Sequence, residues 1–155
     1  MRNLEGMVAW VTGAGTGIGA GAAVALAREG MRVILTGRRL NPLSEVAEAI
    51  NKSGGTADIV QGDAMDRSGM NKIAGDIIEK YGKLDLLFNN HGVNVTDRNW
   101  GGGNLEGWDE VIDVNVKGAY NCAHAALEVM RPQGEGTIIT TSSKAGVGYS
   151  PRAGV

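Results

Sequence analysis

Short apolar runs alternate along this chain with longer segments in which apolar residues recur at helical spacing. The runs are rich in β-branched and aliphatic side chains and predict strands at residues 7–11, 32–36, 56–60, 84–88 and 137–141. The segments between them predict helices over residues 18–28, about 41–50, about 70–81 and about 105–130. Asn41-Pro42 favours a helix start, and Asn104 can cap the longest helix.

This alternation predicts an α/β fold with a doubly wound parallel sheet of the Rossmann type. Strands that alternate with helices of this length are joined by right-handed crossovers, which place helices on both faces of the sheet. The runs are continuously apolar, as expected for strands that are buried on both faces. No internal repeat or linker divides the sequence, so we expect one domain over residues 1–155 that contains the first five strands of the fold.

Composition and charge narrow the class of partner. The chain has 43% hydrophobic and 21% charged residues, which is typical of a folded protein. Its net charge of -2, with no basic run, argues against nucleic acid or an anionic membrane as a partner. One cysteine, no secretory signal and no apolar segment of membrane-spanning length favour a cytoplasmic protein that binds a small molecule.

Glycine is the outlier of the composition, and its first cluster predicts a phosphate site. The segment from Thr12 to Gly19 follows the first predicted strand and opens the first helix. Small residues there let the backbone approach a pyrophosphate, and the helix N-terminus offers unpaired N–H groups to the anion. The alternative is a glycine turn needed only for packing of the helix on the sheet. The predicted cofactor-binding residues of this loop are Gly13, Gly15, Thr16, Gly17, Ile18 and Gly19.

The end of the second strand predicts which dinucleotide is bound. An acidic residue about 20 positions beyond the glycine loop selects NAD in such folds through the ribose 2′-hydroxyl. Here Gly37 occupies that position, and Arg38 and Arg39 follow it. A guanidinium could hold a 2′-phosphate by charge-assisted hydrogen bonds. We therefore predict NADP(H) as the preferred cofactor with NAD(H) possible; the alternative is that one or both arginines are solvated surface charges.

Several motifs together resemble the short-chain dehydrogenase/reductase family. Thr-Gly-x-x-x-Gly-Ile-Gly at Thr12 to Gly19 is similar to the cofactor loop of that family. Asp63, with Ala64 beside it, matches the aspartate that contacts adenine. The segment Asn89-Asn90-His91-Gly92 resembles the family's Asn-Asn-Ala-Gly motif, with histidine in place of alanine. By this resemblance, which covers essentially the whole chain, Asn90 and Gly92 are also predicted to bind the cofactor.

The same resemblance implies an oxidoreductase that interconverts a ketone or aldehyde and an alcohol by hydride transfer. Ser143, after the fifth strand, matches the serine that polarises the substrate carbonyl, and Asn115 matches the asparagine that supports the proton relay through an ordered water. Alternatively, Ser143 merely ends a strand and Asn115 is purely structural. Asn115 lies on a predicted core-facing helix stripe, so its side chain requires a partner. The other members of that stripe are Val111, Gly118, Ala119, Cys122 and Ala126.

The general acid of the family, a tyrosine followed four residues later by a lysine, has no counterpart in this sequence. Tyr149 lies too close to Ser143, and Ala153 stands where its lysine would be. We therefore expect a C-terminally incomplete chain that is inactive alone and homo-oligomeric when complete. The alternative is a non-catalytic dinucleotide-binding module or partner subunit. We expect no metal, interpret His91 and His124 as structural or surface residues, and place the 97–100 loop either at a substrate entrance or on the exposed surface.

Overall fold

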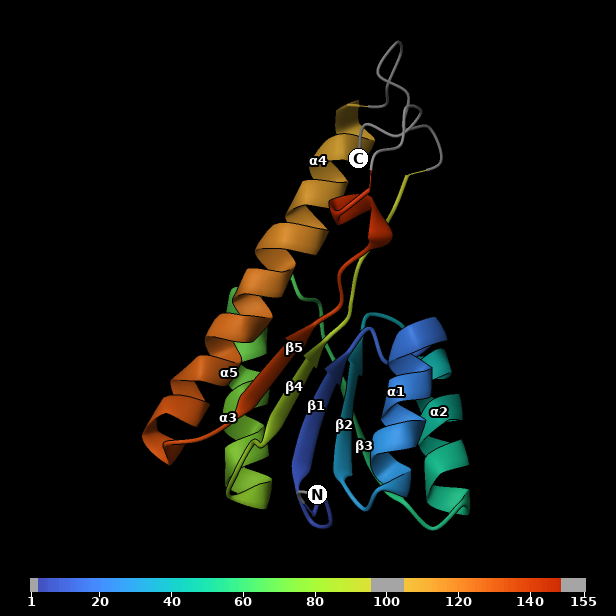
Figure 1. The fold of residues 1–155 in the computed structure, drawn as a ribbon, viewed down its shortest axis with the longest axis vertical. Coiled ribbons are helices and arrows are strands. Elements are labelled where there is room, and N and C mark those ends of the chain that lie inside the picture. Colours follow the sequence, from blue (N-terminus) through green and yellow to red (C-terminus); the bar gives the residue numbers. More distant parts are fainter. Residues whose placement is uncertain (1–2, 96–104, 149–155) are drawn as a thin grey trace.

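A parallel sheet with helices on both faces forms the body of the molecule (Figure 1). The structure is a computed structural model, and it describes residues 3–95 and 105–148. The strands are β1 (Val8–Thr12), β2 (Arg32–Gly37), β3 (Thr56–Gln61), β4 (Leu86–Asn89) and β5 (Thr137–Thr140). The helical elements are α1 (Gly17–Arg28), α2 (Leu40–Lys52), α3 (Arg67–Tyr81), α4 (Leu105–Ile112), η1 (Asp113–Gly118), α5 (Ala119–Gln133) and η2 (Lys144–Gly146).

The order of the strands in the sheet is β3-β2-β1-β4-β5, and all the pairs are parallel. The chain therefore builds outward from β1 on one side as far as β3, and then crosses to the other side to form β4. Crevices at such a switch point, outside the carboxyl ends of the strands, are where ligands bind in open α/β sheets. The predicted doubly wound fold is confirmed.

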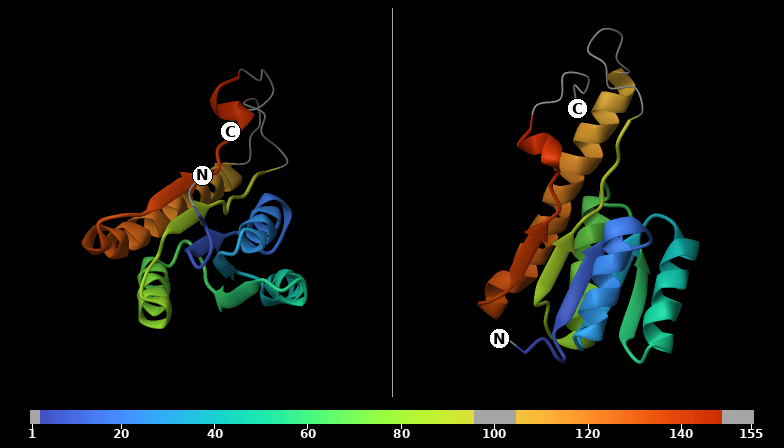
Figure 2. Two further views of the ribbon diagram at one scale, coloured as in Figure 1. Left: turned by 60° about the horizontal axis from the view of Figure 1, so that its bottom comes forward. Right: turned by 45° about the vertical axis from the view of Figure 1, so that its right-hand side comes forward.

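Two apolar clusters lie on opposite faces of the sheet. Val8 and Trp10 belong to the cluster beneath α3 and α5, whereas Ala9 and Val11 belong to the cluster beneath α1 and α2. Successive side chains of a strand point to opposite faces, so the continuous apolar run of β1 supplies both cores. Figure 2 shows the two helical layers on either side of the sheet.

The fifth strand departs from the expected burial. β5 pairs with β4 on one side and forms the edge of the sheet, and Ile139 is 46% exposed. The prediction that all five strands are buried on both faces is therefore wrong for β5. An edge strand has a neighbouring strand on one side only, which leaves the Ile139 side chain partly in contact with solvent.

The predicted long helix is continuous along its path but not uniform. The π-helical stretch η1 interrupts the α-helix at Asp113–Gly118, and the helix then runs on to Gln133. Figure 1 shows this helix running past the carboxyl ends of the strands. None of the helices in the described part of the chain is both long and apolar enough to cross a membrane.

Candidate functional site

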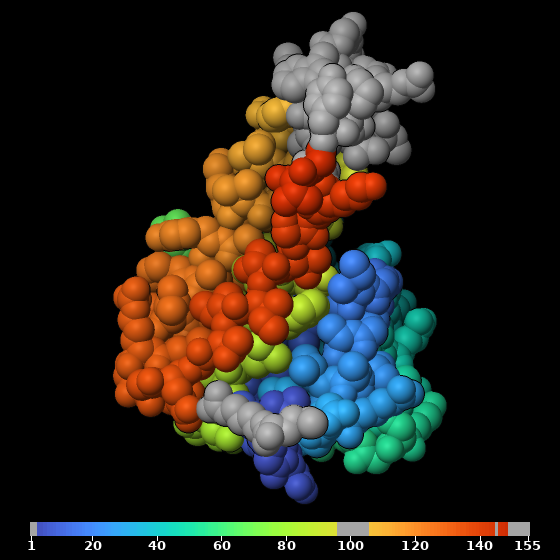
Figure 3. All heavy atoms as spheres, in the orientation of Figure 1, coloured from blue at the N-terminus to red at the C-terminus, as the bar shows by residue number. Residues whose placement is uncertain are grey.

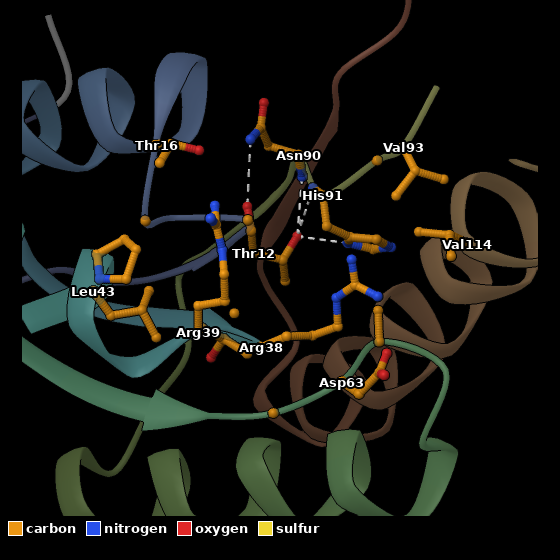
Figure 4. A pocket seen from close by; sticks show the side chains of 18 of the residues that line it. Thr12, Thr16, Arg38, Arg39, Leu43, Asp63, Asn90, His91, Val93 and Val114 are labelled. Carbon is orange, nitrogen blue, oxygen red and sulfur yellow. Dashed lines mark hydrogen bonds between the residues drawn. The ribbon is translucent and has the colours of Figure 1, made fainter. Parts of the chain in front are cut away.

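A cavity of about 380 Å³ lies at the carboxyl edge of the sheet, between the glycine loop and the segments that follow β2, β3 and β4 (Figure 4). Most of the residues predicted to bind a cofactor line it. Those residues are Gly13, Gly15, Thr16, Ile18, Arg38, Arg39, Asp63, Ala64, Asn90 and Gly92. The structure thus brings together side chains from four separate strand ends.

The glycine loop holds a conformation that only glycine adopts easily. Gly13 and Gly17 have φ angles of +61° and +57°, a region that side chains disfavour. A Cβ atom on Gly19 would lie 2.3 Å from the carbonyl oxygen of Gly13. Gly17 and Gly19 do not line the cavity themselves. They shape the turn that brings the start of α1 to it.

The N-terminus of α1 is left available to an anion. Thr16 is the N-cap residue, yet its side chain makes no capping hydrogen bond, and no acidic residue occupies the first turn. The first N–H groups of a helix have no partner within the helix, and the helix dipole makes this end positive. Thr16 and Ile18 line the cavity, so this positive end borders it.

The hydroxyl group of Thr12 organises the end of β1 against the end of β4. It accepts hydrogen bonds from the backbone N–H groups of Asn90 at 3.0 Å and His91 at 3.3 Å. It also lies 2.9 Å from Nδ1 of His91. The side chain of Asn90 is fixed in turn by the Thr141 hydroxyl, which donates to Oδ1 at 3.0 Å. Thr12 and Thr141 were not predicted as site residues, although their positions at strand ends were a usable signal.

The two arginines extend in different directions from the end of β2. In Figure 4 the side chain of Arg39 extends toward Thr12 and the glycine loop, whereas that of Arg38 extends across the cavity toward Asp63. The Gln61 amide donates to the backbone carbonyl of Arg38 at 2.8 Å and holds its main chain in place. Both arginines line the cavity and add positive charge opposite the start of α1.

His91 fills the space between the end of β4 and the π-helical stretch. Burial lowers the pKa of His91, and the backbone of Val114 and the charge of Asp63 oppose that effect only in part. The Thr12 hydroxyl already accepts two N–H groups, and its own hydrogen has two acceptors within reach, Nδ1 of His91 at 2.9 Å and Oδ1 of Asn89 at 3.4 Å. Nε2 is buried without a well-formed hydrogen bond, and a Cβ on Gly118 would lie 2.8 Å from it.

Asn115 differs from the expectation in its burial. It is exposed, whereas its neighbours on the predicted stripe, Val111, Gly118, Cys122 and Ala126, are buried and Ala119 is half-buried. The stripe was drawn with α-helical spacing, and the wider turn of η1 rotates Asn115 off it. The side chain nevertheless has the partner that was required: Oδ1 accepts the N–H of Val93 at 2.8 Å, and Nδ2 donates to its carbonyl at 2.9 Å.

Ser143 follows β5 in an exposed segment just before η2. Neither Ser143 nor Asn115 is among the cavity-lining residues, but each lies close in sequence to one: Thr141 in the first case and Val114 in the second. The predicted catalytic residues therefore lie beyond the cavity wall rather than in it. The loop at 97–100, Asn104, Tyr149 and Ala153 lie outside the described residues.

Figure 3 shows α4, in orange, and the segment after β5, in red, standing above the level of the sheet, with α1, in blue, on the other side. The surface between them leads down to the carboxyl edge, where the cavity lies.

Comparisons with known proteins agree with this geometry. The family model described as short chain dehydrogenase matches residues 7–155. An uncharacterized oxidoreductase of Thermotoga maritima is 37% identical over 150 residues, which cover 97% of this chain and 59% of the relative. A metagenomic short-chain oxidoreductase in complex with NADP has a TM-score of 0.90 at 33% identity, covering 99% of this chain and 69% of that one.

A short chain dehydrogenase/reductase from Burkholderia phymatum in complex with NAD has a TM-score of 0.92 at 30% identity, covering 99% of this chain and 55% of that one. The chain spans 59% to 61% of the length of three curated relatives that it matches. A family model that matches nearly the whole chain, together with the same fold in solved structures, leads to one conclusion. The chain belongs to the short-chain dehydrogenase/reductase family.

Proposed function

We propose that this chain binds NADP(H) in the cavity at the carboxyl edge of the sheet and is the cofactor-binding part of an oxidoreductase. The observation that supports the proposal most strongly is that one cavity joins an uncapped helix N-terminus to two arginines. A dinucleotide with an extra phosphate carries negative charge at both of these places. The solved relatives include one in complex with NADP and one in complex with NAD.

The residues present fit such a group. The turn at Gly13 and Gly17 removes side chains from the path of a pyrophosphate, and the positive end of α1 faces it. No acidic side chain follows β2 to select a ribose 2′-hydroxyl. Arg39, which extends toward the glycine loop, and Arg38, which extends across the cavity, supply the charge for a 2′-phosphate. Asp63 and Ala64 form the wall proposed to receive the adenine.

We further propose that the intact protein interconverts a ketone or aldehyde and an alcohol. The nicotinamide would supply or accept the hydride when it is bound. Negative charge then develops on the substrate oxygen, so the site needs a hydrogen-bond donor aimed at that atom. Ser143 is proposed to donate that hydrogen bond. Asn115, held by both hydrogen bonds to Val93, is proposed to support the proton relay from a fixed position.

The 155-residue polypeptide is expected to bind the dinucleotide without turning it over. Its tyrosines are Tyr81, Tyr120 and Tyr149, and none is followed four residues later by lysine. Loss of general acid catalysis alone reduces rates by roughly 10²- to 10⁴-fold. NADPH oxidation with a panel of ketones and aldehydes measures this; turnover that Ser143→Ala abolishes would contradict it.

Calorimetric titration with NADPH and NADH tests the cofactor assignment. The wild-type chain should bind NADPH more tightly, and Arg38→Asp and Arg39→Asp should each weaken NADPH binding. A charge-assisted hydrogen bond contributes about 1.5–3 kcal/mol, so each loss should be roughly 10- to 150-fold. Lys52→Asp makes the same change of charge at the far end of α2 and should leave the affinity within about twofold.

The two possible failures of this titration have different meanings. Equal affinity of the wild type for NADH and NADPH would show that the arginines do not select a phosphate. Failure of a folded wild-type chain to take up either dinucleotide would remove the cofactor site itself, and the oxidoreductase proposal with it.

We also propose that the intact protein is a cytoplasmic homo-oligomer. Ile112, Val116 and Tyr120 recur at a spacing of four residues along one helix and are 40%, 57% and 59% exposed. Exposed apolar side chains gathered on one face are typical of association surfaces. Light scattering of the intact protein, with Val116→Glu as the variant, tests this; a wild-type monomer at micromolar concentration would contradict it.

A further inference from the structure

We propose that Asn121 is a positioning residue for the adenine end of the dinucleotide, and that it acts with Arg67 by holding the backbone of Ala64. This inference rests on the proposed function, because it takes the cavity to be the dinucleotide site. Ala64 lines that cavity beside Asp63.

Asn121 is a buried amide whose two polar atoms are both used. It lies in the first turn of α5 and is 5% exposed. Nδ2 donates to the carbonyl oxygen of Ala64 at 3.0 Å, and Oδ1 accepts from Nε of Arg67 at 3.1 Å. A buried amide with both halves satisfied fixes the groups that it contacts, because any displacement leaves a polar atom unpaired.

The loop after β3 is tied to β2 at its first residue, where the N–H of Gly62 donates to the carbonyl of Gly37 at 3.2 Å, and two further hydrogen bonds shape the residues that follow. The N–H of Met65 donates to the Asp63 carboxylate at 2.9 Å, and the N–H of Asp66 donates to the Asp63 carbonyl, also at 2.9 Å. Both bonds are internal to the loop and would move with it. The bond from Asn121 to Ala64 joins residues 57 positions apart and ties the loop to α5.

The helix contacts the loop at a second point. A Cβ on Gly118 would lie 3.2 Å from Cβ of Ala64, so the backbone of the helix packs closely against this side chain. Arg67, at the start of α3, has its guanidinium carbon 5.9 Å from the centroid of the Tyr120 ring. Asn121 therefore stands where α3, α5 and the loop meet.

Asp63 lies across the cavity from Leu43 in Figure 4. An adenine in the proposed orientation would occupy the space between these two sides. If the amide is lost, the Ala64 carbonyl is left without its donor and the loop can shift away from the ring. We therefore expect weaker binding of ligands that contain the adenine ring. Binding of a ligand that occupies the glycine loop alone should stay the same.

The test uses the variant Asn121→Leu, which keeps a similar volume and removes both hydrogen bonds. The probes are NADPH, 2′,5′-ADP and inorganic pyrophosphate. We expect the Kd values of NADPH and 2′,5′-ADP to rise together by about 5- to 30-fold, the equivalent of one buried polar group left unpaired. The Kd of pyrophosphate should stay within about twofold, because it reports the glycine loop alone.

Gln133→Leu provides a matched control on the same helix. The Gln133 amide also bonds a backbone from both of its atoms, accepting from the N–H of Leu84 and donating to its carbonyl, each at 3.0 Å. Leu84 lies before β4, at the end of the sheet opposite the cavity. Gln133→Leu should lower stability by a comparable amount and leave all three Kd values unchanged.

The outcomes separate this inference from the proposed function. Unchanged dinucleotide binding by folded Asn121→Leu, or equal losses for all three probes, would overturn the positioning role alone. Failure of the wild type to bind NADPH would overturn both. Should Asn121→Leu not fold, Arg67→Met serves as the second variant. It removes the hydrogen bond from Arg67 to Oδ1 of Asn121 at an exposed residue. This variant must still weaken the binding of 2′,5′-ADP more than the binding of pyrophosphate.

Discussion

A Cβ atom on Gly19 would lie 2.3 Å from the carbonyl oxygen of Gly13, six residues earlier on the same turn. It would also lie 2.6 Å from Nδ2 of Asn90. The turn, the first helix and the end of β4 therefore meet at one point where only a hydrogen atom fits.

Gly19→Ala should consequently destabilise the protein by about 1–3 kcal/mol, the usual result of overpacking a close contact. Gly21→Ala is the matched control, since no atom lies within 4 Å of the Cβ position at Gly21. Alanine in that helix interior should instead stabilise the fold, by up to about 1 kcal/mol. Urea unfolding followed by circular dichroism measures both, and equal effects at the two positions would show that the contact does not matter.

The hydroxyl of Thr12 should matter more than its methyl group. Thr12→Val keeps the shape but leaves the N–H groups of Asn90 and His91 without their acceptor. At about 1–3 kcal/mol for each of these two groups left unpaired, the free energy of unfolding should fall by about 2–6 kcal/mol. Thr12→Ser retains the hydroxyl and should lose only about 1 kcal/mol for the missing methyl. Urea titrations of both variants measure these free energies of unfolding. A loss of stability in Thr12→Ser as large as that in Thr12→Val would contradict the role of the hydroxyl.

The sheet and most of the cavity wall were predictable because their signals are local. The run at β1 is apolar on both faces, and it is buried on both faces. Gly13 and Gly17 have positive φ angles, which glycine adopts far more easily than other residues, so glycines in this loop indicate a tight turn. The parallel topology gathers the carboxyl ends of the strands at one edge, whereas the prediction of Asp63, Ala64, Asn90 and Gly92 as cofactor-binding residues came from the family resemblance.

What the sequence did not reveal depends on contacts between distant segments. The π-helical stretch places Asn115 against the backbone of Val93, 22 residues away, and no periodicity within the helix reports that partner. The same is true of Asn121, whose partner Ala64 lies 57 residues away. Ile139 has the apolar character of a buried strand residue, but its exposure is set by the position of β5 at the edge of the sheet.

Cys122 should be inert in the folded protein. Burial raises the pKa of Cys122 to about 12, with the charge of Asp63 adding to the effect. At pH 8 a thiol with that pKa is ionised to the extent of about one part in 10⁴, and the thiolate is the reactive form. Iodoacetamide should add one mass increment in urea and none under native conditions, because the sequence has one cysteine. Rapid labelling of the native chain would contradict the burial.

His91 should make stability depend on pH on the acidic side of neutrality. Burial holds the pKa of His91 below the ordinary value of 6.5, so below that pH the unfolded chain binds a proton that the native chain resists. The free energy of unfolding should therefore fall as the pH is lowered from about 6.5 toward the native pKa, with a contribution of up to about 1.4 kcal/mol per pH unit. Above pH 6.5 this contribution is constant.

The change that isolates this effect is His91→Gln, which removes the titrating ring from the Thr12 hydroxyl. Other groups titrate in the same range, so the quantity to compare is the difference between wild type and variant in urea midpoints from pH 5 to 7.5. If the slope of His91→Gln matched that of the wild type, the buried ring would not be the group responsible for the pH dependence.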